Sequence, residues 1–247
     1  MNFKDRNIQL CKQLVDKLQI DLRGLKVGLE CASGAYSYIP VMALIAGAEV
    51  LSIGQDSSYG KFEDNISKID NIIHSNIYNK KISFVHRTNL KNNPLLKELN
   101  ILTNSGMIRP INKEIINQLP PYCVIPLMWE TWEFRNQDID ISSCIKRSIP
   151  VIGTNEDFEL IKMFGYNSFI VLKLLFDLNI EGYNNRILLL GGGKSGSAAY
   201  FGLSKMGITI DWLSADKSKH SLDYDEIKYL LKHNFYDAVI NFEHINK

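Results

Sequence analysis

The chain has 247 residues, of which 45% are hydrophobic and 22% are charged, and its formal net charge is +1. These values are ordinary for globular proteins, and the length accommodates one large domain or two small ones. Such an even charge balance does not predict nucleic-acid binding, and no apolar run reaches the roughly 20 residues needed to span a bilayer. The amino terminus lacks the pattern of a signal peptide, so we expect a cytoplasmic protein.

The chemistry-bearing sulfur and imidazole groups are dispersed along the chain. The four cysteines are Cys11, Cys31, Cys123 and Cys144. No two of them have the spacing of metal ligands, and the histidines do not pair at such a spacing either. The sequence therefore predicts buried, reduced thiols and no metal site.

The first part of the chain alternates between strand and helix patterns. Expected helices lie at 3–21, 38–48, 66–77, 94–99, 113–119 and 139–147. Expected strands lie at 26–30, 49–53, 82–86, 101–103, 123–129 and 149–152. The polar stretch 54–65 follows a strand, which makes it a candidate ligand-facing loop.

The second part begins with residues 156–177, which are apolar on most faces and predict one long, heavily buried helix, either continuous or interrupted near Gly165. Expected strands then lie at 187–190, 208–213 and 238–242, and expected helices at 197–206 and 223–233. Alternating strands and helices imply mostly parallel sheets. The fold class is therefore α/β, with two doubly wound, Rossmann-like units joined by a long buried helix. We expect a substrate-type domain at 1–155, a linking helix at 156–178 and a nucleotide-binding domain at 179–247, which the end of the chain could leave incomplete.

A faint internal repeat relates these two units. Residues 26–56 align without a gap on 186–216 in the same β-α-β order, with Gly47 on Gly207 and Asp56 on Asp216. The first copy lacks the glycine triplet of the second. We therefore expect no dinucleotide in the first unit.

The glycine-rich segment after the strand at 187–190 carries the clearest functional pattern. Gly191, Gly193 and Gly196 have the G-x-G-x-x-G spacing, in which the glycines permit a tight turn, close approach of the backbone to a pyrophosphate, and close packing of helix on strand. The segment follows an apolar strand and opens a helix, whose amino terminus attracts phosphate. The predicted site for NAD or NADP consists of Gly191, Gly192, Gly193, Lys194, Ser195 and Gly196. The alternative is a glycine-rich turn without a ligand.

The choice between NAD and NADP depends on the end of the next strand, where an acid accepts hydrogen bonds from the ribose of NAD. Ser214 occupies the expected position of that acid, and Asp216 lies close behind it. Lys217 follows at once and offers a cation for a 2′-phosphate. Asp216 favours NAD and Lys217 favours NADP, so both cofactors stay open.

Residues 100–155 add a family resemblance. After the Asn104-Ser105-Gly106 turn come the segment Asn-Gln-Asp-Ile-Asp at 136–140 and the segment Ser-Ile-Pro-Val-Ile-Gly-Thr-Asn at 148–155. This order resembles the D-isomer-specific 2-hydroxyacid dehydrogenases and their formate dehydrogenase relatives, although Ser148 replaces the usual glycine and the final Thr-Asn is reversed. The resemblance covers roughly 100–242. A similar layout occurs in S-adenosylhomocysteine hydrolase and alanine dehydrogenase relatives.

The resemblance implies an NAD(P)-binding oxidoreductase-like protein acting on a small polar or carboxylate substrate. The family's catalytic Arg, Glu and His lie on later strands, and this chain ends at Lys247 before those positions, so the catalytic residues stay unassigned. One alternative is a non-catalytic dinucleotide-binding or sensing accessory protein. Another is an S-adenosylhomocysteine hydrolase-like protein that uses a nucleotide.

Four residues are candidates for contact with a substrate: Ser105, Arg109, Glu130 and Arg135. They follow predicted strands, at the end where α/β sheets bind ligands, and an arginine can hold a carboxylate through two hydrogen bonds. The alternative for 129–135 is a loop whose aromatic residues cap the core and whose charges pair with one another. We expect a dinucleotide and a small molecule as partners, without nucleic acid or membrane. The unfinished sheet edge at 238–242 is compatible with a homo-oligomer.

Overall fold

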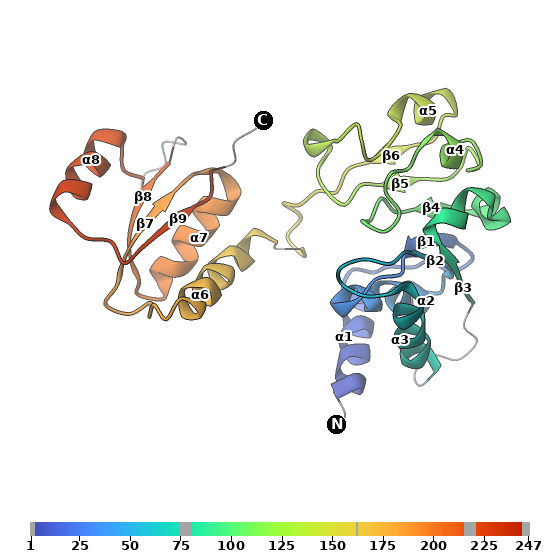
Figure 1. Cartoon of the computed structure of the whole chain (residues 1–247), viewed down its shortest axis with the longest axis horizontal. Coiled ribbons are helices and arrows are strands. Elements are labelled where there is room, and N and C mark those ends of the chain that lie inside the picture. Colours follow the sequence, from blue (N-terminus) through green and yellow to red (C-terminus); the bar gives the residue numbers. More distant parts are fainter. Residues whose placement is uncertain (1–2, 75–80, 162, 215–220, 244–247) are drawn as a thin grey trace. The chain divides into compact units, whose positions relative to one another are not determined.

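The computed structural model describes residues 3–74, 81–161, 163–214 and 221–243. The chain forms two compact units, Met1–Asn155 and Glu156–Lys247, called here the first and the second unit (Figure 1). Both units combine helices with parallel sheets, so the α/β class predicted from the alternating pattern is confirmed. Across the ranges described, no helix is both long enough and apolar enough to cross a membrane.

Within its described residues, the first unit has six short parallel strands. They are β1 (Lys26–Glu30), β2 (Glu49–Gly54), β3 (Ile82–His86), β4 (Ile101–Leu102), β5 (Ile125–Pro126) and β6 (Val151–Ile152). The first four form a sheet in the order β3-β2-β1-β4, and β5 pairs with β6. A bridge between Ile101 and Val124 continues the sheet from β4 to β5. The order 3-2-1-4-5-6 is that of a Rossmann sheet, whose direction of winding reverses between β1 and β4.

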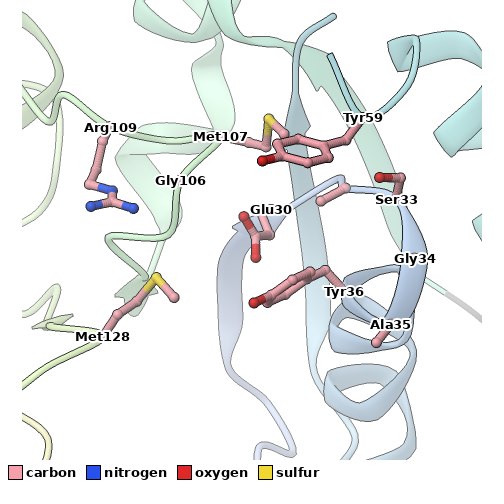
Figure 2. Close-up of a pocket in the computed structure, with 11 residues that line it drawn as sticks. Glu30, Ser33, Gly34, Ala35, Tyr36, Tyr59, Gly106, Met107, Arg109 and Met128 are labelled. Atoms are coloured by element: carbon pink, nitrogen blue, oxygen red, sulfur yellow. The ribbon is translucent and has the colours of Figure 1, made fainter. Parts of the chain in front are cut away.

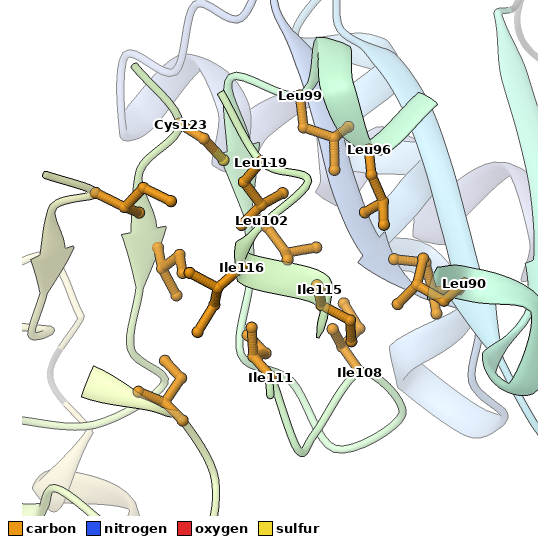
Figure 3. Packing of buried hydrophobic residues seen from close by; sticks show 14 of the residues in the cluster. Leu90, Leu96, Leu99, Leu102, Ile108, Ile111, Ile115, Ile116, Leu119 and Cys123 are labelled. Carbon is orange, nitrogen blue, oxygen red and sulfur yellow. The ribbon is translucent and has the colours of Figure 1, made fainter. Parts of the chain in front are cut away.

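Helices cover the first unit's sheet and bury two cores. The α-helices are α1 (Phe3–Lys17), α2 (Ile39–Ile45), α3 (Phe62–His74), α4 (Lys113–Ile116) and α5 (Ile141–Lys146). The 3-10 helices are η1 (Gly34–Tyr38), η2 (Arg87–Asn92), η3 (Pro94–Glu98) and η4 (Thr131–Glu133). Successive strand residues face opposite cores, so Val50 packs with one core and Leu51 with the other. Figure 3 shows the core that contains Leu102 and the isoleucines of α4.

Several predicted elements of the first unit are shorter than the sequence pattern suggested. The apolar run 123–129 contributes only Ile125–Pro126 as strand, because proline lacks the N–H that would continue a ladder. The helix predicted at 113–119 ends at Ile116. By contrast, α3 begins at Phe62, four residues earlier than predicted, where the Asp56 side chain accepts a hydrogen bond of 2.8 Å from the Phe62 N–H.

The second unit is a smaller parallel sheet with helices packed on it. Its strands are β7 (Arg186–Leu190), β8 (Thr209–Leu213) and β9 (Ala238–Asn241), in the order β8-β7-β9. Its helices are η5 (Phe164–Tyr166), α6 (Asn167–Asp177), α7 (Gly193–Lys205) and α8 (Tyr224–His233). The helix predicted at 197–206 thus begins four residues earlier, inside the glycine turn. Asp223 and Glu226 form a capping box at the start of α8.

The helix predicted at 156–177 is not continuous: it is interrupted near Gly165, as the alternative allowed, and the predicted heavy burial is wrong. The α-helix starts only at Asn167, after the 3-10 turn that contains Gly165, and glycine is a poor helix former. Only one stripe of α6 is buried, through Val171 and Leu175. Four large apolar side chains are 45–60% exposed: Phe169, Ile170, Leu174 and Phe176. An apolar composition on all faces therefore did not mean burial on all faces.

Candidate functional site

The glycine turn of the second unit requires glycine at its first and third motif positions for steric reasons. Gly191 has φ +108°, and a Cβ there would lie 2.8 Å from backbone atoms of Phe242 and Glu243. A Cβ on Gly196 would collide with the Gly191 carbonyl oxygen and lie 3.0 Å from its carbon. The first glycine thus permits the turn, and the third permits α7 to pack against it. These are the roles that the dinucleotide motif assigns to them.

The middle glycine has a different environment. Gly193 is the first residue of α7 and has φ +63°, and a Cβ there would meet no atom within 4 Å. Gly193 therefore has no side chain on the side of its backbone where there is open space. That is the geometry required for a pyrophosphate to approach the backbone at a helix amino terminus. On this observation the residues present fit a dinucleotide.

A buried tryptophan holds the turn in place. The Trp212 indole N–H donates a 2.8 Å hydrogen bond to the Gly191 carbonyl oxygen, and the Gly191 N–H donates to the Leu213 carbonyl oxygen at 2.9 Å. Trp212 is 2% exposed, and its ring stacks on Tyr200 with a centroid distance of 4.7 Å. The sequence analysis missed this residue. An aromatic N–H donor in the strand beside a glycine turn is the feature that identifies it.

The polar residues of the predicted nucleotide site take up separate positions. The Lys194 ammonium lies 2.5 Å from the Asp157 carboxylate and over the Phe164 ring, so an acid already offsets its charge. Ser195 lies half-buried in the first turn of α7, and Ser214 is buried directly after β8. The Leu213 carbonyl oxygen accepts a hydrogen bond from the Gly191 N–H, and Ser214 is the next residue in the chain, so Ser214 lies beside the glycine turn. Asp216 and Lys217 lie outside the described residues.

The first unit has a pocket of about 390 Å³ at the place where the winding of its sheet reverses (Figure 2). Its walls come from Glu30 at the end of β1, residues 32–36 after it, and three residues after β4, together with Tyr59 and Met128. The three residues after β4 are Gly106, Met107 and Arg109. Open α/β sheets bind their ligands at this reversal point, outside the carboxyl ends of the strands. Tyr59 comes from the stretch 54–65 that was predicted to face a ligand.

A buried carboxylate forms one side of this pocket. Glu30 is the last residue of β1 and is 4% exposed. Burial raises the pKa of its carboxyl group above the ordinary value, against the opposing effects of hydrogen bonds from the Met107 N–H and the Ser105 side chain and of the Arg109 charge. A buried, chemically perturbed carboxyl in a pocket is typical of ligand sites.

The guanidinium of Arg109 forms the other side. Its Nη1 lies 3.2 Å from the Asp138 carboxylate, and the group lies 4.8 Å from the centre of the Trp129 ring. The Arg135 guanidinium also lies over the Trp129 ring, at 4.7 Å. These contacts fix the orientation of Arg109, which is the one cationic side chain among the described residues lining the pocket.

The structure brings together only part of the predicted substrate site. Ser105 forms a hydrogen bond with Glu30, and the Arg109 charge acts on Glu30 without an ion pair, whereas Glu130 and Arg135 are not among the described residues that line the pocket. Glu130 instead accepts a 2.6 Å hydrogen bond from the Trp132 indole. Sequence reasoning missed Glu30, whose signal was an acid at the end of a buried strand, followed by a turn containing glycine.

The sulfur chemistry is as predicted. All four cysteines are free and buried. Burial raises the pKa of Cys31 to about 11 and that of Cys123 to about 12, so both are thiols at neutral pH. In the described ranges, no three His, Cys, Asp or Glu side chains gather as metal ligands would.

Comparison with solved structures places the fold. The chain is similar to dipicolinate synthase from Bacillus subtilis, with a TM-score of 0.59 and 11% identity, over 90% of this chain and 74% of that one. Dipicolinate synthase from Bacillus halodurans gives a TM-score of 0.55 and 12% identity, over 90% and 75%. Shikimate 5-dehydrogenase from Listeria monocytogenes, solved with shikimate and NAD, gives 0.41 and 13%, over 60% and 51%.

The sequence itself matches no family model and no curated protein. At 11–12% identity the likeness to dipicolinate synthase establishes the fold and nothing finer. The chain has a Rossmann-like α/β architecture, which the two dipicolinate synthase chains share over about three quarters of their length.

Proposed function

We propose that the chain is an NAD(P)-binding oxidoreductase-like protein. In this proposal the glycine turn of the second unit binds the dinucleotide, and the pocket of the first unit binds a small polar or carboxylate substrate. The observation that carries the proposal is that a Cβ would collide with backbone at Gly191 and at Gly196, while Gly193 opens α7 with open space beside it. This combination in the G-x-G-x-x-G order is what a pyrophosphate site requires.

The proposed contacts follow from this arrangement. The backbone at Gly193 and the amino terminus of α7 face the pyrophosphate, and Ser195 adds a hydroxyl group. Ser214 lies where the adenosine ribose is expected, and Asp216 or Lys217 decides between NAD and NADP. A bound nicotinamide would supply hydride transfer. Membership of the D-isomer-specific 2-hydroxyacid dehydrogenases is a hypothesis within this proposal.

The test is a calorimetric titration of the full chain with the oxidised and reduced forms of NAD and NADP. Wild type should bind one pair saturably. Gly193→Asp should weaken binding at least tenfold, or about 1.4 kcal/mol, because it places a carboxylate where the pyrophosphate lies. The matched control is Gly207→Asp, at the other end of α7, where φ is +82° and the space beside the backbone is equally open. Gly207→Asp should keep its affinity.

Two results would overturn the nucleotide site: folded wild type that binds neither cofactor, or equal losses in the test and control variants. Turnover is a separate question, answered by following nicotinamide absorbance with a panel of small carboxylates. Binding without any turnover would favour the accessory or sensing protein over the oxidoreductase.

A further inference from the structure

The pocket of the first unit holds two opposite charges that do not pair with each other. Glu30 lies on one side and Arg109 on the other, and the Arg109 charge influences the Glu30 carboxylate. Among the described contacts, the ion pair of Arg109 is with Asp138 and not with Glu30. A buried carboxylate without a cation in contact is costly. A ligand that contacts both groups would remove that cost.

Gly106 marks the space between the two charges. A Cβ on Gly106 would lie 3.6 Å from Nη2 of Arg109 and 4.0 Å from Oε2 of Glu30, which are ordinary contact distances. The volume that glycine leaves open therefore borders the guanidinium and the carboxylate at once. Figure 2 shows Gly106 between Arg109 and Glu30 on the rim of the pocket.

The remaining walls are mostly apolar or aromatic, with Ser33 as a polar exception. Tyr36 and Tyr59 lie on either side of Glu30, and Met107 and Met128 also line the pocket. Aromatic rings attract an ammonium group as well as apolar carbons, and methionine adapts to irregular apolar shapes. The walls suit an apolar side chain, and the two ends suit opposite charges.

We propose that this pocket binds an α-amino acid with an apolar side chain, its ammonium group against Glu30 and its carboxylate against Arg109. A monocarboxylate would satisfy Arg109 but would set an anion near Glu30. A simple amine would satisfy Glu30 but would set a cation near Arg109. A zwitterion satisfies both, and in an α-amino acid its two charged groups are attached to the same carbon, so one small ligand can present both to the space beside Gly106.

Binding of the amino acid itself does not depend on the dinucleotide. Only its role as the substrate of hydride transfer rests on the proposed function. Binding is therefore measured by calorimetry on the full chain without nucleotide, using leucine and phenylalanine as probes.

Matched analogues decide which charges are recognised. Isocaproate is leucine without its ammonium group, and isoamylamine is leucine without its carboxylate. For phenylalanine, the corresponding analogues are hydrocinnamate, which lacks the ammonium group, and phenethylamine, which lacks the carboxylate. Each analogue should bind at least tenfold more weakly than its parent, because it leaves one of the pocket's two charged groups without a partner. A carboxylate analogue that binds as tightly as its parent overturns the zwitterion, as does the absence of amino acid binding.

Gly106→Ala tests the location without removing either charge. The added methyl makes only ordinary contacts and fills the space between Glu30 and Arg109, so the variant should fold and lose at least tenfold in affinity. The control is Gly165→Ala in the second unit, whose Cβ would meet nothing within 4 Å. Full affinity in Gly106→Ala would overturn the proposed site.

The same samples are then titrated with NAD and NADP. Cofactor binding without amino acid binding overturns this inference and leaves the proposed function standing. Amino acid binding without cofactor binding supports this inference and overturns the proposed function.

Discussion

The two units place different chemistry at the same point of the same β-α-β frame. On the gapless alignment of 26–56 with 186–216, Glu30 falls on Leu190 and Tyr36 falls on Gly196. The frame itself is preserved, because β1 and β7 align along their whole length. Gly47 and Gly207 both follow their helices with positive φ, +95° and +82°. The difference lies in the turn after the first strand and in the start of the helix that follows it.

That difference decides what each turn can hold. In the second unit, glycines let α7 pack directly on the turn and leave bare backbone beside open space. In the first unit, the turn carries side chains, and a short 3-10 helix precedes α2. A pocket bounded by Glu30 and Tyr36 takes the place of a backbone cradle. Under our proposal, the same frame supplies an anion site where side chains are absent and a charged pocket where they are present.

The largest expected effect comes from Gly196→Ala. The methyl would overlap the Gly191 carbonyl, which is backbone and cannot move aside cheaply. We expect a loss of about 2–3 kcal/mol of unfolding free energy, at the upper end for overpacking, together with the loss of dinucleotide binding. Hydrogen exchange should show faster exchange in α7 and β7 and unchanged exchange in β1.

Its counterpart is Tyr36→Ala in the first unit, where the side chain is 55% exposed. Little stability should be lost there, because that turn does not depend on close helix packing. If Gly196→Ala kept wild-type protection in α7, the packing difference between the two turns would be refuted.

A smaller effect, of opposite sign, is expected from Glu30→Gln. Burial raises the folded-state pKa of Glu30, so the folded protein holds that proton over a pH range in which the unfolded chain has lost it. Wild-type stability therefore falls as pH rises from the ordinary glutamate pKa to the raised one, and the deficit remains above it. Glutamine carries no such charge, so the variant should be more stable than wild type at neutral pH.

Urea unfolding across a pH series measures this. The advantage of Glu30→Gln should shrink to nothing as pH falls below the ordinary pKa of glutamate. Glu159→Gln, at an exposed position in the second unit, should show no such trend. An advantage independent of pH would mean that packing, and not the buried charge, distinguishes the first turn.

The sequence predicted the frame and the glycine turn because both depend on local patterns. The strands Lys26–Glu30 and Ile82–His86 have the predicted bounds, since each has apolar residues in a short segment that ends at a polar residue. The turn at Gly191–Gly196 followed from spacing and from its position between strand and helix. These features need no knowledge of which strands are neighbours.

The pocket could not be predicted in the same way. Glu30 lies near Ser105 and Arg109 only because β4 lies beside β1, across the point where the winding of the sheet reverses. The alternation of helices and strands does not specify that strand order. Glu130 and Arg135 had equally suggestive neighbours in the sequence, yet η4 and the loop after it direct them to Trp132 and Trp129.

The smallest expected effect concerns the cation in the second turn. Lys194 pairs with Asp157, and both side chains are largely exposed, so Asp157→Asn should change stability by no more than about 0.5 kcal/mol. Asp157→Asn should change the affinity for a dinucleotide more than it changes stability. The substitution removes a carboxylate that competes with the phosphates for the Lys194 ammonium group. Affinity should rise by a few fold at low salt, and the gain should fade as salt screens the charges.

Calorimetry at two salt concentrations measures this change, with Asp177→Asn as the control for removal of an exposed acid that pairs with another lysine, Lys173. An unchanged affinity in Asp157→Asn would mean that Lys194 serves only to tie the turn to the segment before η5. The anion site would then rest on backbone alone. The contrast with the first unit, where side chains supply the charges, would become sharper still.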